Sequence, residues 1–172
     1  AISGATEEEF KALNDQAKQL GADTAFSASQ AAEGMENLAS AGFSVEEITA
    51  AMPGLLDLAA ASGEDLAASS EIAASAIRAF GLEADDAGHV ADVLAANANM
   101  TNAAVVDTGY AFKYVAPIAK SLGISMEETA ASIGILSNAG IKGEQAGTVL
   151  RGAMTRLVKP TEAAANAAEA LG

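Results

Sequence analysis

The sequence repeatedly ends one helix at a glycine and starts another within a few residues. In the segment 41–47, Gly42 can adopt the left-handed conformation that closes a helix, and the apolar Phe43 can pack back onto the last turn. Ser44, with Glu47 three residues later, can then cap the following helix. The same layout recurs at 80–86, 122–128 and 139–145. A chain with this many sharp corners is predicted to form a compact stack of short helices.

Composition supports an all-α fold with a core of small side chains. The 172 residues are 51% hydrophobic but only 4% aromatic, and the chain has no Trp. Apolar residues recur at helical spacing, whereas the alternation typical of strands is nearly absent. We therefore predict an all-α, compact bundle of roughly eight to ten short helices joined by glycine-centred tight corners.

Capping signals, together with glycine and proline residues, set the expected helix boundaries. Pro53 is expected to start a new helix after Met52, Pro117 to kink or restart a later one, and the polar stretch 97–102 to interrupt the pattern. The sixteen Gly and three Pro exclude a continuous rod, because an interior glycine costs about 1 kcal/mol and an interior proline about 3 kcal/mol. The expected helices are 6–21, 27–42, 44–52, 53–62, 64–80, 85–97, one through Tyr110 and Tyr114, 125–138, 144–158 and 161–171.

The length predicts a single helical domain, residues 1–172, with two sub-domains, 1–100 and 101–172, as the alternative. Because the chain opens without Met and closes inside an alanine-rich run, we expect it to be an excerpt of a longer chain.

Weak self-similarity also runs through the sequence. Gly21, Gly42 and Gly63 are evenly spaced, and the segment 32–43 is echoed at 131–141. Either an internal duplication or chance drift explains this pattern.

Charge and cysteine content exclude several functions. The formal net charge of −14 disfavours a free-standing DNA-binding role, because nucleic-acid affinity depends on neutralising phosphates. The absence of Cys excludes disulfides, Cys-ligated zinc and thiol catalysis. The longest uncharged apolar stretches fall well short of the ~20 residues that a transmembrane span needs. Four of the nine cations, Lys142, Arg151, Arg156 and Lys159, lie near the C-terminal end; a solvated helix face is the favoured interpretation, and a patch for nucleic acid or an acidic partner is the alternative.

His89 is the one candidate centre for metal or acid–base chemistry. Asp85 and Asp92 would share a helix face with it, so the three side chains could bind a metal or form an acid–base pair. Ordinary charges on a solvated helix face explain the same pattern, and we favour that interpretation.

Three pairs of glutamates resemble catalytic carboxylates, but each falls in the first turn of a predicted helix, where capping and the helix dipole account for it. They are Glu7 and Glu8, Glu46 and Glu47, and Glu127 and Glu128. No phosphate-cradling loop, nucleophile elbow or zinc-protease motif occurs in the sequence. We expect no enzyme activity, no cofactor and no catalytic or metal-binding residues.

Two further patterns are better explained by helix packing within the chain than by binding to a partner. Gly143 and Gly147, with Gly152 beyond, would let helix backbones approach closely, and packing within the chain is favoured over helix dimerisation. Tyr110 and Tyr114 lie one turn apart and predict a core or half-buried face.

Several phrases together resemble the core region of phage tail tape-measure proteins. One is AAEGMENLASAGF at 31–43, and the others lie at 20–28, 50–61, 79–82, 90–95, 113–117, 121–125 and 139–143. They span nearly the whole chain in the order found in that family.

The resemblance implies a structural protein of the virion tail that is present in the bacterial cytoplasm during assembly. It implies tail-tube, baseplate-hub and tail-assembly-chaperone proteins as partners, self-association of the full-length protein, no specific nucleic acid, and no catalytic residues. Because glycine corners prevent length from growing with residue number, we expect a docking or hub domain that organises tail assembly and tail length, with the measuring rod elsewhere. The alternatives are a generic helical adaptor without a tail role and, with least support, a peptidoglycan hydrolase.

Overall fold

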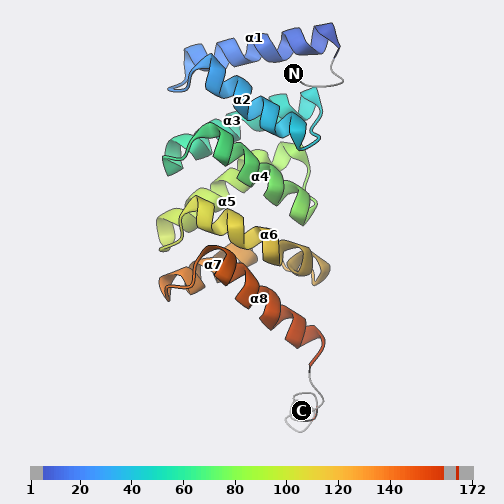
Figure 1. Ribbon diagram of the computed structural model, residues 1–172, viewed down its shortest axis with the longest axis vertical. Coiled ribbons are helices and arrows are strands. Elements are labelled where there is room, and N and C mark those ends of the chain that lie inside the picture. The colour runs from blue at the N-terminus through green and yellow to red at the C-terminus, as the bar shows by residue number, and fades with distance from the viewer. Residues whose placement is uncertain (1–5, 161–165, 167–172) are drawn as a thin grey trace.

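A computed structural model describes residues 6–160 and residue 166, and this part folds into helices joined by short turns (Figure 1). The α-helices are α1 (Glu7–Asp23), α2 (Ala28–Ser40), α3 (Val45–Ser62), α4 (Leu66–Phe80), α5 (Ala87–Met100), α6 (Val105–Ser121), α7 (Met126–Asn138) and α8 (Gly143–Val158), with a 3-10 helix, η1 (Ala84–Asp86), before α5. The predicted all-α bundle of short helices is confirmed. The further helix expected at 161–171 lies outside the described residues, apart from Asn166. Across the described ranges, no helix is both long enough and apolar enough to span a bilayer.

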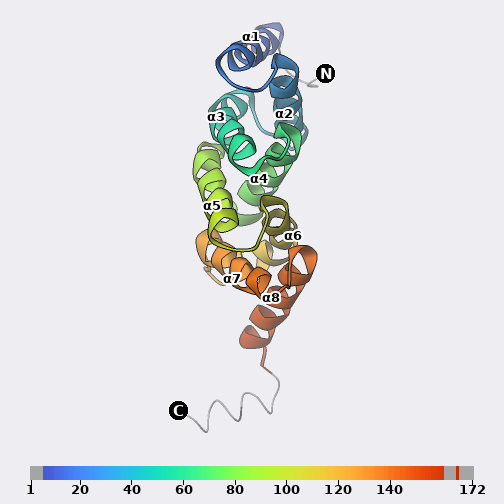
Figure 2. The ribbon, with the colours of Figure 1, turned by 90° about the vertical axis from the view of Figure 1, so that its left-hand side faces the viewer.

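The helices stack in two layers along the long axis of the molecule. Helices α2, α4, α6 and α8 pack on one another in that order, and α3, α5 and α7 form the second layer (Figure 1). Helix α1 packs on α2 at the N-terminal end of the stack. The view turned by 90° shows the two layers side by side (Figure 2). Each helix thus contacts mainly its chain neighbours and the helix two places along, as in helical repeat proteins.

The predicted corners are confirmed, and Gly42 shows how they work. Its φ is 87°, and the Phe43 N–H donates to the Leu38 carbonyl at 3.1 Å, which closes a Schellman motif. Phe43 is buried against the last turn, and the Ser44 and Glu47 side chains form the capping box of α3. Gly81, Gly123 and Gly140 also have positive φ, and the residue after each makes the same backbone bond.

The repeating unit is a pair of helices. The corner glycines Gly42, Gly81 and Gly123 follow α2, α4 and α6, about 40 residues apart. The shorter glycine spacing seen in the sequence is not the unit, because Gly21 lies inside α1 and does not end it as expected. A Cβ at Gly21 would lie 2.4 Å from the backbone nitrogen of Ala28, so glycine there allows α1 to approach the start of α2.

Pro53 and Pro117 do not interrupt their helices. Helix α3 runs through Pro53 and α6 through Pro117, so the break expected after Met52 and the restart expected at Pro117 are wrong. Pro53 leaves the Thr49 carbonyl without its helical donor. The Gln16 side chain of α1 donates to that carbonyl at 3.1 Å, and this tertiary contact replaces the missing backbone bond.

The polar stretch 97–102 is an ordered corner and does not fray as expected. Helix α5 continues to Met100, and Asn97 is only 7% exposed. Its Nδ2 donates to Thr108 Oγ1 of α6 at 2.9 Å, while the Thr101 hydroxyl donates to the Asn97 carbonyl at 2.7 Å. Buried polar groups that are paired in this way fix the angle between two helices.

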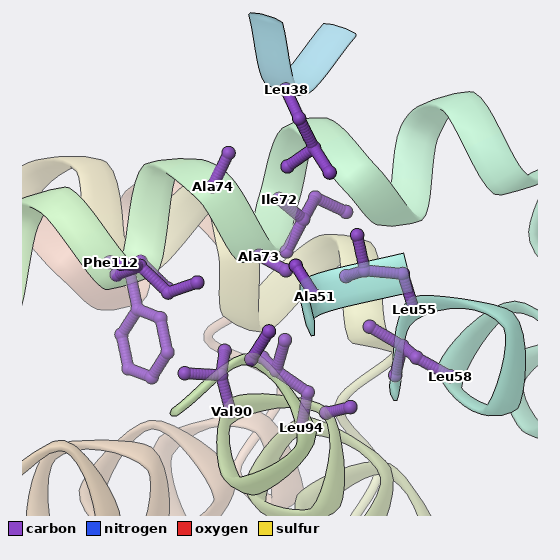
Figure 3. Close-up of a cluster of buried hydrophobic side chains, with 14 of the residues drawn as sticks. Leu38, Ala51, Leu55, Leu58, Ile72, Ala73, Ala74, Val90, Leu94 and Phe112 are labelled. Carbon is purple, nitrogen blue, oxygen red and sulfur yellow. The ribbon is translucent and has the colours of Figure 1, made fainter. Parts of the chain in front are cut away.

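The hydrophobic core is continuous from Leu13 in α1 to Met154 in α8. Figure 3 shows a central part of it, with Leu55 of α3 and Val90 and Leu94 of α5 among the buried side chains. Many of the remaining core positions are alanines that are fully buried, which is the core of small side chains that the composition predicts.

Glycine also lies where stacked helices cross. A Cβ at Gly54 of α3 would lie 2.6 Å from Gly88 Cα of α5, and one at Gly147 of α8 would lie 2.4 Å from the Ala111 carbonyl oxygen of α6. These helices approach so closely only because a side chain is missing at the crossing. Gly147 therefore packs within the chain, as predicted, whereas a Cβ at Gly143 or Gly152 would meet no backbone atom within 4 Å.

Candidate docking surface

A groove lies between α6 and α8 near the C-terminal end of the stack. Its volume is about 610 Å³, and the Cβ position of Gly152 has no atom within 4 Å, so the groove is open there. The two helices approach each other closely at Gly147 and Ala111, outside the groove. The lining residues are Lys113, Tyr114, Pro117 and Ile118 of α6, and Arg151, Gly152, Thr155 and Arg156 of α8.

Positive charge is concentrated at this groove in an otherwise acidic chain. Residues 142–159 carry four cations and one anion, whereas residues 1–141 carry five cations and 20 anions. Lys113 pairs with Glu71 at 3.1 Å. Arg151 and Arg156 are exposed, and among the described residues neither is in an ion pair. Two guanidinium groups beside an open groove suit a carboxylate- or phosphate-bearing partner.

The sequence located only part of this surface. Of the four C-terminal cations, Arg151 and Arg156 line the groove, whereas Lys142 and Lys159 lie at the two ends of α8 and do not. Lys113 and half-buried Tyr114 come from a helix about 40 residues earlier. Only the repeat spacing of the helices could have indicated that α6 and α8 are neighbours.

His89 lines another pocket, of about 280 Å³, beside the corner between α6 and α7. Its Nε2 lies 2.5 Å from Oε1 of Glu127, at the start of α7, and both side chains are about half exposed. The expected neighbours Asp85 and Asp92 are not its hydrogen-bond partners in the structure. In the part of the chain that the structure covers, no three His, Asp or Glu side chains gather as metal ligands would.

The Glu127 carboxylate is stabilised in its charged form. The Ser125 hydroxyl, its own backbone N–H and then His89 lower its pKa to about 2. Since the ordinary value is 4.5, this contribution to stability is complete above about pH 4.5 and is lost as the pH falls through about 2. The pair links α5 to α7, and we assign it a role in joining stacked helices.

Glu127→Gln is expected to lower the free energy of unfolding by about 0.5 kcal/mol at pH 7, because solvent screens a half-exposed pair. The difference from the wild-type chain should shrink as the pH is lowered from 4.5 toward 2, which urea denaturation at several pH values would measure. Glu46→Gln is a matched control: Glu46 also follows its capping serine by two residues, but no described residue hydrogen bonds to its side chain. An equal, pH-dependent loss in both variants would contradict the assignment.

The other candidate residues serve the fold. The glutamate pairs lie in the first turns of α1, α3 and α7, where Glu9, Glu47 and Glu128 complete capping boxes. Tyr110 is 45% exposed, and the Lys113 ammonium lies 5.2 Å from its ring centre.

The apolar side chains of the first helix are only partly buried. Leu13 and Ala17 are buried, but Phe10 is 56% exposed and borders a pocket of about 150 Å³ between α1 and α2.

Comparison with known proteins gives one consistent result. The phage-related minor tail protein family matches residues 14–172. The chain is 64% identical over 172 residues to the tape measure protein of Pneumococcus phage Dp-1, covering 100% of this chain and 15% of that protein. It is 40% identical over 164 residues to the probable tape measure protein of Escherichia phage P2, covering 95% of this chain and 20% of that protein. No solved structure matches.

The chain therefore spans less than a quarter of the length of these two relatives. Both the family match and the identities extend over nearly all of it, including the stacked helices and the basic groove. The chain belongs to the phage-related minor tail protein family and is similar to a region of phage tape-measure proteins.

Proposed function

We propose that this chain is a folded docking or hub domain of a tape-measure protein, with a structural, non-enzymatic role in organising tail assembly and tail length. Its partners would be tail-tube, baseplate-hub and tail-assembly-chaperone proteins, met in the host cytoplasm during assembly and retained in the virion tail. The full-length protein would also associate with itself.

This proposal rests on how little length each added residue gives to a stack of short helices. A helix pair of about 40 residues adds only about 10 Å to a stack, the distance between packed helix axes. The same residues in one continuous helix would extend about 60 Å. A protein that sets length economically would use continuous helices for that purpose, so this region serves better as a compact attachment unit.

Deletions in the parent gene test the role. Removing this block is expected to abolish tails or misdirect their assembly, whereas equally long deletions in the helical remainder should shorten tails in proportion. Tail lengths and counts by electron microscopy would measure both effects. Proportional shortening on trimming this block would contradict the proposal.

Reversing the charge of the groove in the same assay would distinguish a loss of docking from a loss of folding. Arg151→Glu with Arg156→Glu should reduce the number of complete tails while leaving the helical content of the purified chain unchanged. Lys11→Glu with Lys18→Glu, on exposed positions of α1, is the matched control and should leave tail number unchanged. Equal tail counts in the two double variants would exclude the groove as the docking surface.

A further inference from the structure

Helices α4 and α6 each bury an apolar stripe in the same register. Each stripe occupies the positions 7, 11 and 15 residues after the N-cap residue. Ile72 of α4 meets Gly109 of α6, and Ala111 of α6 meets Gly147 of α8, so the next even helix covers the stripe each time. The buried stripes are Ile72, Ala76 and Phe80 in α4, and Ala111, Val115 and Ala119 in α6.

Helix α8 carries the same stripe, but no described helix covers it. Counted from its N-cap residue Lys142, the stripe is Val149, Ala153 and Leu157. Val149 is 43% exposed and Leu157 is 82% exposed, whereas the equivalent Ala111 and Ala119 are fully buried. Helix α8 ends the described stack (Figure 1).

The second layer ends in the same way. Ile135 of α7 lies twelve residues after the corner glycine Gly123, as Gly54 of α3 lies after Gly42. Gly54 faces Gly88 of the next odd helix, but Ile135 is 70% exposed. We call Ile135, Val149 and Leu157 the end face.

The chain itself supplies a segment that fits the end face. After Lys159 and Pro160, the apolar residues Ala164, Ala167, Ala168 and Leu171 fall on one side of a helical projection. The opposite side carries Glu162, Asn166 and Glu169. An 11-residue helix is about 16 Å long, enough to run back along α8.

The short linker favours this segment over another occupant. Two residues connect it to α8, so a helix starting there must begin beside Leu157. We propose that residues 161–171 dock on the end face as the next helix of the stack, with the alanine stripe against Ile135 and the α8 stripe.

Engineered disulfides test the docking, because the chain has no Cys of its own. Ile135→Cys would be combined in turn with Ala164→Cys, Ala167→Cys and Ala168→Cys in the 172-residue chain. Since Ile135 is 70% exposed, its replacement should leave the fold intact, which circular dichroism would verify. At least one pair should form an intramolecular disulfide about tenfold faster than a pair on the polar side.

Two control pairs fix the interpretation. Ile135→Cys with Glu169→Cys places a thiol on the polar side, and Phe10→Cys with Ala167→Cys places one at the far end of the stack; both should react slowly. Non-reducing electrophoresis and mass spectrometry at low protein concentration would separate the products. Equal rates at all positions would overturn the proposal, and so would disulfide-linked dimers through position 135, which would show that a second copy occupies the end face.

Discussion

Phe112→Ala is expected to lower the free energy of unfolding by about 3–5 kcal/mol. Phe112 is 2% exposed, and its ring meets Phe80 edge-on at 5.1 Å between centres. The alanine would leave a cavity between α4 and α6 (Figure 3). Since the Ile72 side chain of α4 already packs directly against Gly109 of α6, the two helices cannot move closer to fill the space. Urea denaturation followed by circular dichroism would measure the loss.

Phe10→Ala is the matched control for the same chemical change. Phe10 is 56% exposed at the N-terminal end, so its removal should change the free energy of unfolding by no more than about 0.5 kcal/mol. Equal losses for the two variants would contradict the placement of the core. A large loss for Phe112→Ala in a single transition would show that the stack unfolds cooperatively from its centre.

Local chemistry explains why the corners could be predicted from sequence. The bonds that close the turn at Gly42 and cap the helix after Ser44 join residues at most five positions apart. No distant residue is needed, so glycine, the apolar residue after it and the capping pair already contain the information. Of the three glutamate pairs, Glu47 and Glu128 serve as caps for the same reason, whereas Glu127 pairs with His89.

The prolines show where local reasoning fails. Pro53 removes a backbone bond because it lies inside α3, and sequence alone cannot show that Gln16, in another helix, donates to the Thr49 carbonyl instead. Likewise, the ordering of 97–102 depends on a hydrogen bond from Asn97 to Thr108. In both cases a tertiary contact compensates for a weak local signal.

The candidate surface could be predicted only in outline. The run of cations near the C-terminal end was visible, but the groove exists because α8 packs on α6, which brings Lys113 and Arg151 together. The partner of His89 was missed for the same reason, since Glu127 lies 38 residues away on α7. Both neighbours follow from the helix-pair repeat of about 40 residues.

Gly147→Ala and Gly152→Ala are expected to change stability in opposite directions, although both replace glycine within α8. A Cβ at Gly147 would lie 2.4 Å from the Ala111 carbonyl oxygen and 2.9 Å from its Cα, both backbone atoms. Helix α8 must therefore shift, and we expect a net loss of about 1–3 kcal/mol. At Gly152 the added methyl group meets nothing within 4 Å, so alanine should stabilise the helix by about 0.5–1 kcal/mol.

Hydrogen exchange would show which helices each substitution destabilises, as well as how strongly. In a stack where each helix contacts mainly its neighbours, Gly147→Ala should increase exchange in α8 and the facing part of α6 while α2 and α3 keep their protection. Gly152→Ala should leave exchange in α6 unchanged. If both substitutions stabilised the chain, α8 would not approach α6 at Gly147, and the groove formed by these two helices would lose its structural basis.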